Sequence, residues 1–207
     1  SSFFLQATLL SVTCQPKGTF TQIHAETQTL KEIANTSFRG KDYLASHNTY
    51  TQCLSLSLSI PRLSLSPFPE HFSSYFNLVV ALLLNKGLCE WRMKAFSESL
   101  ISLRAVLHLC EGETADMTCQ KETKAKDEKE GSDDPLSLTA LYHPTIITHR
   151  AKAHYRMGMV YLSMENFRYS KQQLSLSLSL SPNDQNTKNA LKKVVAEEEK
   201  KKQREKK

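Results

Sequence analysis

The sequence predicts an all-α fold, made of three helix–turn–helix repeats followed by a long charged helix. The strongest observation is a stretch of about 34 residues, from Ala151 to Asp184, whose small and apolar residues have the spacing of two closely packed antiparallel helices. Two earlier stretches carry the same pattern less completely. The chain has 207 residues, which is enough for three such repeats, about the minimum for a self-supporting array.

The first repeat covers residues 31–54. Ala34 is small at the place where the two helices would cross, and Gly40 and Asp42 mark the turn between them. The remaining core positions are apolar or small: Phe38, Tyr43, Ser46, Tyr50, Cys53 and Leu54. The Leu-Ser alternation that follows has the period of a strand, but we expect it to prolong the second helix to about Leu58.

The second repeat is less regular. Its first helix is expected near Phe72–Asn85, where Asn77 precedes an apolar run, and its second helix at Phe96–Leu109. This placement leaves several residues in excess around Lys86–Ala95, so the sequence does not fix how these two helices align. Leu63–Ser66 lies between two prolines, and we expect a loop there.

The third repeat is the most complete. Gly158, Ser170 and Ser177 are small and would allow two helices to cross closely, and Pro182 would end the second helix. Larger side chains fill the space between the helices: Met157, Tyr161, Phe167, Leu174 and Leu178. Before this repeat, residues 111–134 are rich in Glu, Lys, Thr, Asp and Gly without apolar periodicity, and we expect a mobile insert.

The two ends of the chain extend beyond the repeats. Phe3–Val12 has the pattern of an apolar strand, which is explained either by the end of an upstream β-rich domain or by an extra helix or ordered tail. Residues from Ala190 onward continue as a helix whose apolar side would cover the open end of the array. We therefore divide the chain into an N-terminal extension (1–26), a repeat domain (27–190) and a basic helical extension (191–207).

Charge and cysteine content narrow the classes of function. Much of the net charge of +6 comes from the Lys-rich tail, Lys192–Lys207, which contains no aromatic residue, so base stacking and nucleic-acid binding are not expected. Such a run is typical of a solvated helix end; contacts with calmodulin or a membrane surface, or a localisation signal, are the alternatives. The longest apolar run, Leu78–Leu84, is too short to span a bilayer. Five cysteines without a Cys-x-x-Cys pair are typical of free thiols in a reducing compartment, which indicates the cytoplasm, with the nucleus as the alternative.

Five residues on the first helices form a candidate site: Lys31, Asn35, Asn77, Lys152 and Arg156. Lys31 and Asn35 are four residues apart and share a helix face, as do Lys152 and Arg156. Because the first helices of stacked repeats line one concave surface, we expect these side chains to converge. Three cations and two amides are suitable donors for carboxylates, and several charge-assisted hydrogen bonds could hold a short peptide at about −8 kcal/mol, a micromolar affinity.

Residues from about Thr27 to Lys207 resemble the tetratricopeptide-repeat (TPR) domain of chaperone-binding co-chaperones, especially the large immunophilins of the FKBP, cyclophilin-forty and aryl-hydrocarbon-receptor-interacting kinds. The family's Lys-x-x-Gly-Asn motif corresponds to Lys31-Glu-Ile-Ala-Asn35, with Ala in place of Gly. Its second-repeat Asn corresponds to Asn77, with Leu78 where Arg often follows, and its Lys-Ala-x-x-Arg motif to Lys152–Arg156.

This resemblance implies a binding module for the acidic C-terminal tail, of Met-Glu-Glu-Val-Asp type, of chaperones of the heat-shock protein ninety or seventy class. The five residues would form the carboxylate clamp. A TPR scaffold with a partner that does not use the clamp is the alternative. No catalytic arrangement is evident and no cofactor or metal is expected, although a full-length immunophilin would add a peptidyl-prolyl isomerase domain.

Overall fold

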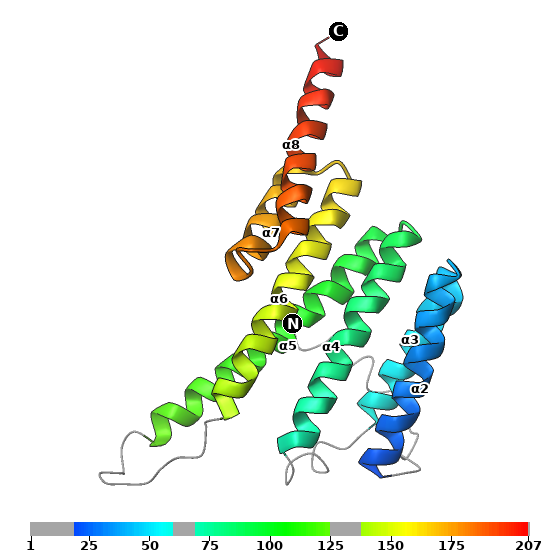
Figure 1. Ribbon diagram of the computed structural model, residues 1–207, viewed down its shortest axis with the longest axis vertical. Coiled ribbons are helices and arrows are strands. Elements are labelled where there is room, and N and C mark those ends of the chain that lie inside the picture. Colours follow the sequence, from blue (N-terminus) through cyan, green and yellow to red (C-terminus); the bar gives the residue numbers. More distant parts are fainter. Residues whose placement is uncertain (1–18, 60–68, 125–137, 207) are drawn as a thin grey trace. The chain divides into compact units, whose positions relative to one another are not determined.

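The computed structural model describes residues 19–59, 69–124 and 138–206, and this part of the chain is almost entirely helical (Figure 1). Its elements are α2 (Phe20–Arg39), α3 (Tyr43–Leu58), α4 (Pro69–Arg92), α5 (Phe96–Lys124), α6 (Leu138–Ser163), α7 (Phe167–Leu180) and α8 (Gln185–Glu205). The predicted all-α fold with a long charged C-terminal helix is confirmed. The strand expected at Phe3–Val12 and the loop expected at Leu63–Ser66 lie outside the described residues.

The helices belong to two compact units, residues 1–82 and 83–207, whose boundary falls within α4. In the first unit α2 and α3 form a helical hairpin. The backbone N–H of Thr19 donates to Oε1 of Gln22 at 3.0 Å, which satisfies a group at the start of α2. The helix therefore begins before the predicted domain boundary at residue 27. Its first turns belong to the core, because Ile23 is buried and packs against Leu56 and Tyr75.

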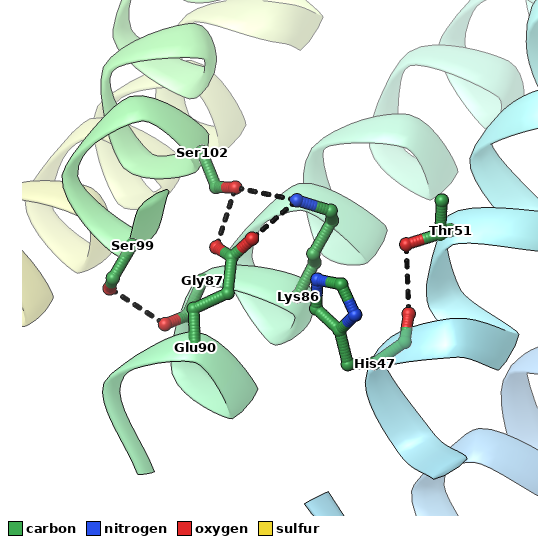
Figure 2. Close-up of polar contacts among 7 residues, drawn as sticks. All are labelled: His47, Thr51, Lys86, Gly87, Glu90, Ser99 and Ser102. Atoms are coloured by element: carbon green, nitrogen blue, oxygen red, sulfur yellow. Dashed lines mark hydrogen bonds and ion pairs between the residues drawn. The ribbon is translucent and has the colours of Figure 1, made fainter. Parts of the chain in front are cut away.

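A serine hydroxyl marks the crossing of the two helices in each of three hairpins, α2–α3, α4–α5 and α6–α7. In the first, Ser46 Oγ donates to the carbonyl of Ala34 at 2.9 Å. In the second, Ser99 Oγ donates to the carbonyl of Gly87 at 2.7 Å (Figure 2). In the third, Ser170 Oγ donates to the carbonyl of Gly158 at 2.8 Å. Ala34, Gly87 and Gly158 are therefore equivalent positions.

The turns between the paired helices repeat as well. Each contains one non-glycine residue with a positive φ angle: Lys41 at 65°, Lys94 at 64° and Glu165 at 55°. Each of these residues lies at the same distance in sequence from the crossing residue of its hairpin, as the pairs 34 and 41, 87 and 94, and 158 and 165 show. A left-handed backbone costs free energy for these side chains, so its recurrence shows that one turn geometry closes all three hairpins.

The second hairpin corrects the expected boundaries. Residues 86–92, which the predicted helices did not include, are the last turns of α4. The turn is confined to residues 93–95. Lys86 and Glu90 interrupt the apolar pattern there and made the helix seem to end at Asn85. They form a polar network with α5 instead: Lys86 Nζ lies 2.5 Å from Glu90 Oε1, and Ser102 Oγ donates to Glu90 Oε2 at 2.7 Å (Figure 2).

The expected mobile insert also requires correction. Residues 111–124 are helical, because α5 continues to Lys124, while residues 125–134 lie outside the described part of the chain. The absence of apolar periodicity in residues 111–124 did not mean that this segment lacks a helix. Glu, Ala, Met, Gln and Lys are all good helix formers, and they can prolong a helix beyond the point where it has a core to cover.

The Leu-Ser alternations form helices, as predicted. The first lies in the last turns of α3 and the other in α7, which ends at Leu180, just before Pro182. In α7, Leu174 is fully buried. Leu176, by contrast, is 41% exposed, as its place in the helical register requires.

α8 covers the end of the third hairpin. Its Ala190 and Val194 are buried in a cluster with Leu174, and Tyr155 and Met159 of α6 pack against this cluster. Asp184 is the N-cap residue of α8. Its carboxylate accepts hydrogen bonds from the Thr187 hydroxyl and from the backbone N–H groups of the first turn, and these bonds lower the pKa of Asp184.

Two ion pairs tie α8 to the third hairpin. Lys171 Nζ lies 2.7 Å from Glu198 Oε2, and Lys201 Nζ lies 2.7 Å from Glu165 Oε2.

Candidate functional site

The predicted site residues all lie on the first helices of the hairpins. Lys31 and Asn35 are half-buried on α2, and Asn77 is half-buried on α4 within the first unit. Lys152 and Arg156 lie on α6, in the second unit. Each of the five residues thus lies on the helix that the sequence predicted for it. The convergence of all five on one groove remains a prediction.

Asn35 is oriented by the neighbouring helix. Tyr50, which is buried on α3, donates its hydroxyl to Oδ1 of Asn35 at 2.6 Å, and Asn35 Nδ2 donates to Glu32 Oε1 at 3.1 Å. With its oxygen held by Tyr50, the amide directs its Nδ2 donor to the carboxylate of Glu32, an exposed residue. A donor that already binds a carboxylate is of the kind that the clamp requires.

The register of α4 indicates a site residue that the sequence analysis missed. Arg156 lies two residues before Gly158, and the residue with the same relation to Gly87 is Asn85. Asn77 lies more than two turns further toward the start of the same helix. The sequence carries a signal for this assignment, since Asn85-Lys-Gly87 parallels Arg156-Met-Gly158. This parallel was not recognised because the second repeat could not be aligned with the third before Gly87 was known to be the crossing residue.

Arg156 connects α6 with α4 beside Asn85. Its Nη1 donates to the backbone carbonyl of Leu84. Since the Leu84 carbonyl belongs to the peptide bond with Asn85, this contact places the Arg156 guanidinium beside the Asn85 backbone within the second unit. Lys152 is exposed one turn earlier on α6. One guanidinium, one ammonium and one amide therefore lie on two neighbouring helices, and groups of these kinds suit a carboxylate.

A half-buried histidine, His149, lies one turn before Lys152 on α6. The pKa of His149 is lowered, first because burial disfavours the imidazolium and second because the Lys152 charge repels it. His149 is therefore neutral at pH 7 and adds no charge beside Lys152.

The structure describes the side chains of three cysteines. Cys53, Cys89 and Cys110 are fully buried. Burial raises the pKa of the Cys53 thiol to about 11, so it remains protonated and is a poor nucleophile at neutral pH.

Metal sites and membrane-spanning helices are both absent from the described ranges. These ranges contain no group of three His, Cys, Asp or Glu side chains that could hold a metal ion. Nor does any helix there have the length and apolar character needed to cross a membrane.

The chain is similar in fold to several solved TPR domains. The C-terminal TPR-containing domain of a Plasmodium falciparum protein described as FK506-binding superposes with a TM-score of 0.57 at 14% identity, covering 90% of this chain and 97% of that one. The OM64 TPR domain of Arabidopsis gives 0.51 at 12% identity, with 84% and 98% covered. The Sgt2 TPR domain of Aspergillus fumigatus gives 0.50 at 14% identity, with 86% and 82% covered.

These similarities establish the class of fold. At such low identity they show that the chain has a TPR-like all-α fold, in agreement with the three equivalent hairpins. No family model matches the sequence, and no curated protein does. Its function must therefore be argued from its own residues.

Proposed function

We propose that this chain is a co-chaperone TPR module that binds the acidic C-terminal tail of chaperones of the heat-shock protein ninety or seventy class. The observation that carries this proposal is the contact of Arg156 with the Leu84 carbonyl, which brings a guanidinium to the backbone of α4 at the residue before Asn85. Lys152 completes a donor set on the α4–α6 side, and Lys31 and Asn35 supply a second donor set on α2. TPR domains with this fold include that of an FK506-binding protein, which supports an adaptor role of the immunophilin kind.

In the proposed clamp the donors bind the α-carboxylate and the side-chain carboxylate of a terminal Asp. Each charge-assisted hydrogen bond contributes about 1.5–3 kcal/mol when the alternative is an unpaired group. The site is partly exposed, so we expect binding to weaken as salt is added. A chaperone tail of this type also places the chain in the cytoplasm, with the nucleus as the alternative.

The structure argues against calmodulin as a partner of the basic tail. A helix bound by calmodulin must present an apolar face. Ala190 and Val194 of α8 are buried against the third hairpin, and the residues that follow Val195 are almost entirely charged or polar. To present an apolar face, α8 would have to detach from the third hairpin and expose Ala190 and Val194.

The proposal is tested by fluorescence anisotropy with a labelled Met-Glu-Glu-Val-Asp peptide, as the free acid and as the C-terminal amide. We expect the amide to bind at least about tenfold more weakly, because it lacks the terminal charge. Lys152→Ala should cause a similar loss. Arg168→Ala removes a positive charge from an exposed site on α7 and serves as the matched control. Equal affinities for acid and amide would contradict the clamp.

Two asparagines on one helix provide a test of the register. Asn85→Ala should weaken binding of the free acid about tenfold, the loss expected for one hydrogen bond to a charged group, whereas Asn77→Ala should have little effect. Both variants should melt near the temperature of the parent protein, as judged by circular dichroism. The opposite ranking would restore Asn77 as the second-repeat residue of the clamp.

A further inference from the structure

The last turn of α4 carries an arginine stacked on a tryptophan. The guanidinium carbon of Arg92 lies 4.9 Å from the centroid of the Trp91 ring. The ring itself is held in place, because its Nε1 donates to Ser163 Oγ of α6 at 2.9 Å. Arg92 is exposed, and within the described ranges no carboxylate forms a salt bridge with it.

Helix geometry places this pair on the same side of α4 and α6 as the proposed clamp. Arg92 lies seven residues after Asn85, and Ser163 lies seven residues after Arg156. Seven residues are nearly two helical turns, so each later residue lies on the same face as the earlier one, about 10 Å further along the axis. The contact between Arg156 and Leu84 and the contact between Trp91 and Ser163 therefore join the same faces of the two helices at two levels.

The chemistry at the second level suits an anion. A guanidinium that stacks on an aromatic face keeps its N–H edges available, and its planar fork matches a carboxylate. The stacking also restricts the Arg92 side chain, so less conformational entropy is lost when it binds. For a peptide that runs along α4 and α6 from the clamp toward Arg92, an extended chain advances about 3.3 Å per residue, so about 10 Å corresponds to three residues.

We propose that Arg92, held on Trp91, is a specificity-determining residue that binds an acidic side chain about three residues before the C-terminus of the bound peptide. This inference rests on the proposed clamp and deepens it, since it adds a preference along the peptide. In Met-Glu-Glu-Val-Asp the side chain concerned is the first Glu. A terminal carboxylate alone would then account for only part of the recognition.

The test is a double-mutant cycle between the protein and the peptide. The probes are free-acid Met-Glu-Glu-Val-Asp and two variants in which either the first or the second Glu is replaced by Gln. They are titrated against the parent protein, Arg92→Gln and the control Arg168→Gln, which removes the same charge from α7. Because the pair is exposed, replacing the first Glu should weaken binding to the parent about two- to fivefold at low salt.

In Arg92→Gln that two- to fivefold difference should disappear, while the effect of replacing the second Glu stays unchanged. Trp91→Leu, which removes the aromatic platform, should reduce the same difference. Discrimination of the first Glu that persists in Arg92→Gln would overturn the proposal. So would a loss that is equal for all three peptides, because Arg92 would then act only on the stability of the end of α4.

The acid-versus-amide comparison separates the two proposals. If the free acid and the amide bind equally, the clamp itself is wrong. If the acid binds better but Arg92 shows no coupling to the first Glu, the clamp stands and only the role of Arg92 fails.

Discussion

The second and third hairpins share one helix crossing but fill the space beside it with different chemistry. Three positions around the crossing glycine differ: Lys86, Glu90 and Ser102 in the second hairpin correspond to Met157, Tyr161 and Gln173 in the third. In the second hairpin the three side chains form a hydrogen-bonded ionic network around Glu90, which is 2% exposed. In the third, Met157 is buried as an apolar side chain, 4% exposed.

This difference shows which features define the crossing. Both hairpins keep the glycine, the serine that donates to its carbonyl, and a leucine opposite the glycine. The neighbouring positions hold an ionic network in the second hairpin. In the third they hold the apolar Met157 together with Tyr161 and Gln173, whose polar ends hydrogen-bond to Arg104 and His154. The two solutions should nevertheless respond very differently to substitution.

The largest effect is expected from breaking the network of the second hairpin. Lys86→Met places the residue of the third hairpin there. The Glu90 carboxylate stays buried beside the Ser102 hydroxyl but loses the opposite charge of Lys86. Removing one member of a buried ion pair costs about 3–5 kcal/mol, and since the Lys86 side chain is 21% exposed, we expect a loss at the lower end, about 3 kcal/mol. Urea denaturation followed by circular dichroism measures it.

The double variant Lys86→Met, Glu90→Gln serves as the control. The neutral amide that Glu90→Gln introduces can still accept a hydrogen bond from the Ser102 hydroxyl but carries no charge that needs a partner. Much of the lost stability should therefore return. If the double variant is as unstable as the single one, the cost does not come from an uncompensated charge.

The next effect is expected at the crossing of the third hairpin. A Cβ atom on Gly158 would lie 2.6 Å from Cγ and 2.8 Å from Cδ2 of Leu174, which is fully buried. Gly158→Leu would force the two helices apart, and we expect it to destabilise by about 1–3 kcal/mol or more through overpacking. Peptide affinity should fall as well, because α6 carries Lys152 and Arg156. A thermal melt identical to that of the parent would contradict this crossing.

Alanine at the two glycines makes the comparison sharper. At Gly87 the added Cβ would lie 3.2 Å from Leu103 Cγ, a contact that a small shift relieves. There the gain in helix propensity, roughly 0.5–1 kcal/mol, should offset the strain and leave stability nearly unchanged. At Gly158 the closer contact should win, and we expect a net loss of about 1 kcal/mol. Chemical denaturation of both variants measures the difference, and a Gly158→Ala protein as stable as Gly87→Ala would show that Leu174 can move aside.

The sequence predicted the fold and most helix positions because small residues, turn residues and proline act locally. The third hairpin could be placed from Gly158, Ser170 and Pro182 alone, and the first from Ala34 and Ser46. The second could not, because Lys86 is charged where the other two hairpins have Ile33 and Met157, and Glu90 is charged where they have Ser37 and Tyr161. Both charged residues also bind Ser102, which comes from the next helix, and a local pattern does not contain that information.

The same limit applied to the candidate site. Lys31, Asn35, Lys152 and Arg156 follow from spacing on helices that were placed correctly. The sequence did not indicate Asn85, which we propose as the second-repeat residue of the clamp, because its place is defined by its relation to Gly87, and Gly87 was not recognised as a crossing residue. The role that we propose for Arg92 could not be predicted either, because it depends on the contact of Trp91 with Ser163 on another helix.

The smallest effect is expected where the two hairpins are alike. Ser99 and Ser170 are both fully buried and donate to the carbonyls of Gly87 and Gly158 at 2.7 and 2.8 Å. Replacing either serine by alanine removes one hydrogen bond, and because each carbonyl also lies in the hydrogen-bond ladder of its helix, the loss should be about 0.5–1.5 kcal/mol and nearly equal at both sites. Urea titrations of Ser99→Ala and Ser170→Ala test this. A loss confined to one hairpin would mean that the shared crossing does not have a shared energy, and that the glycine and leucine contacts, rather than the serine, hold the other pair together.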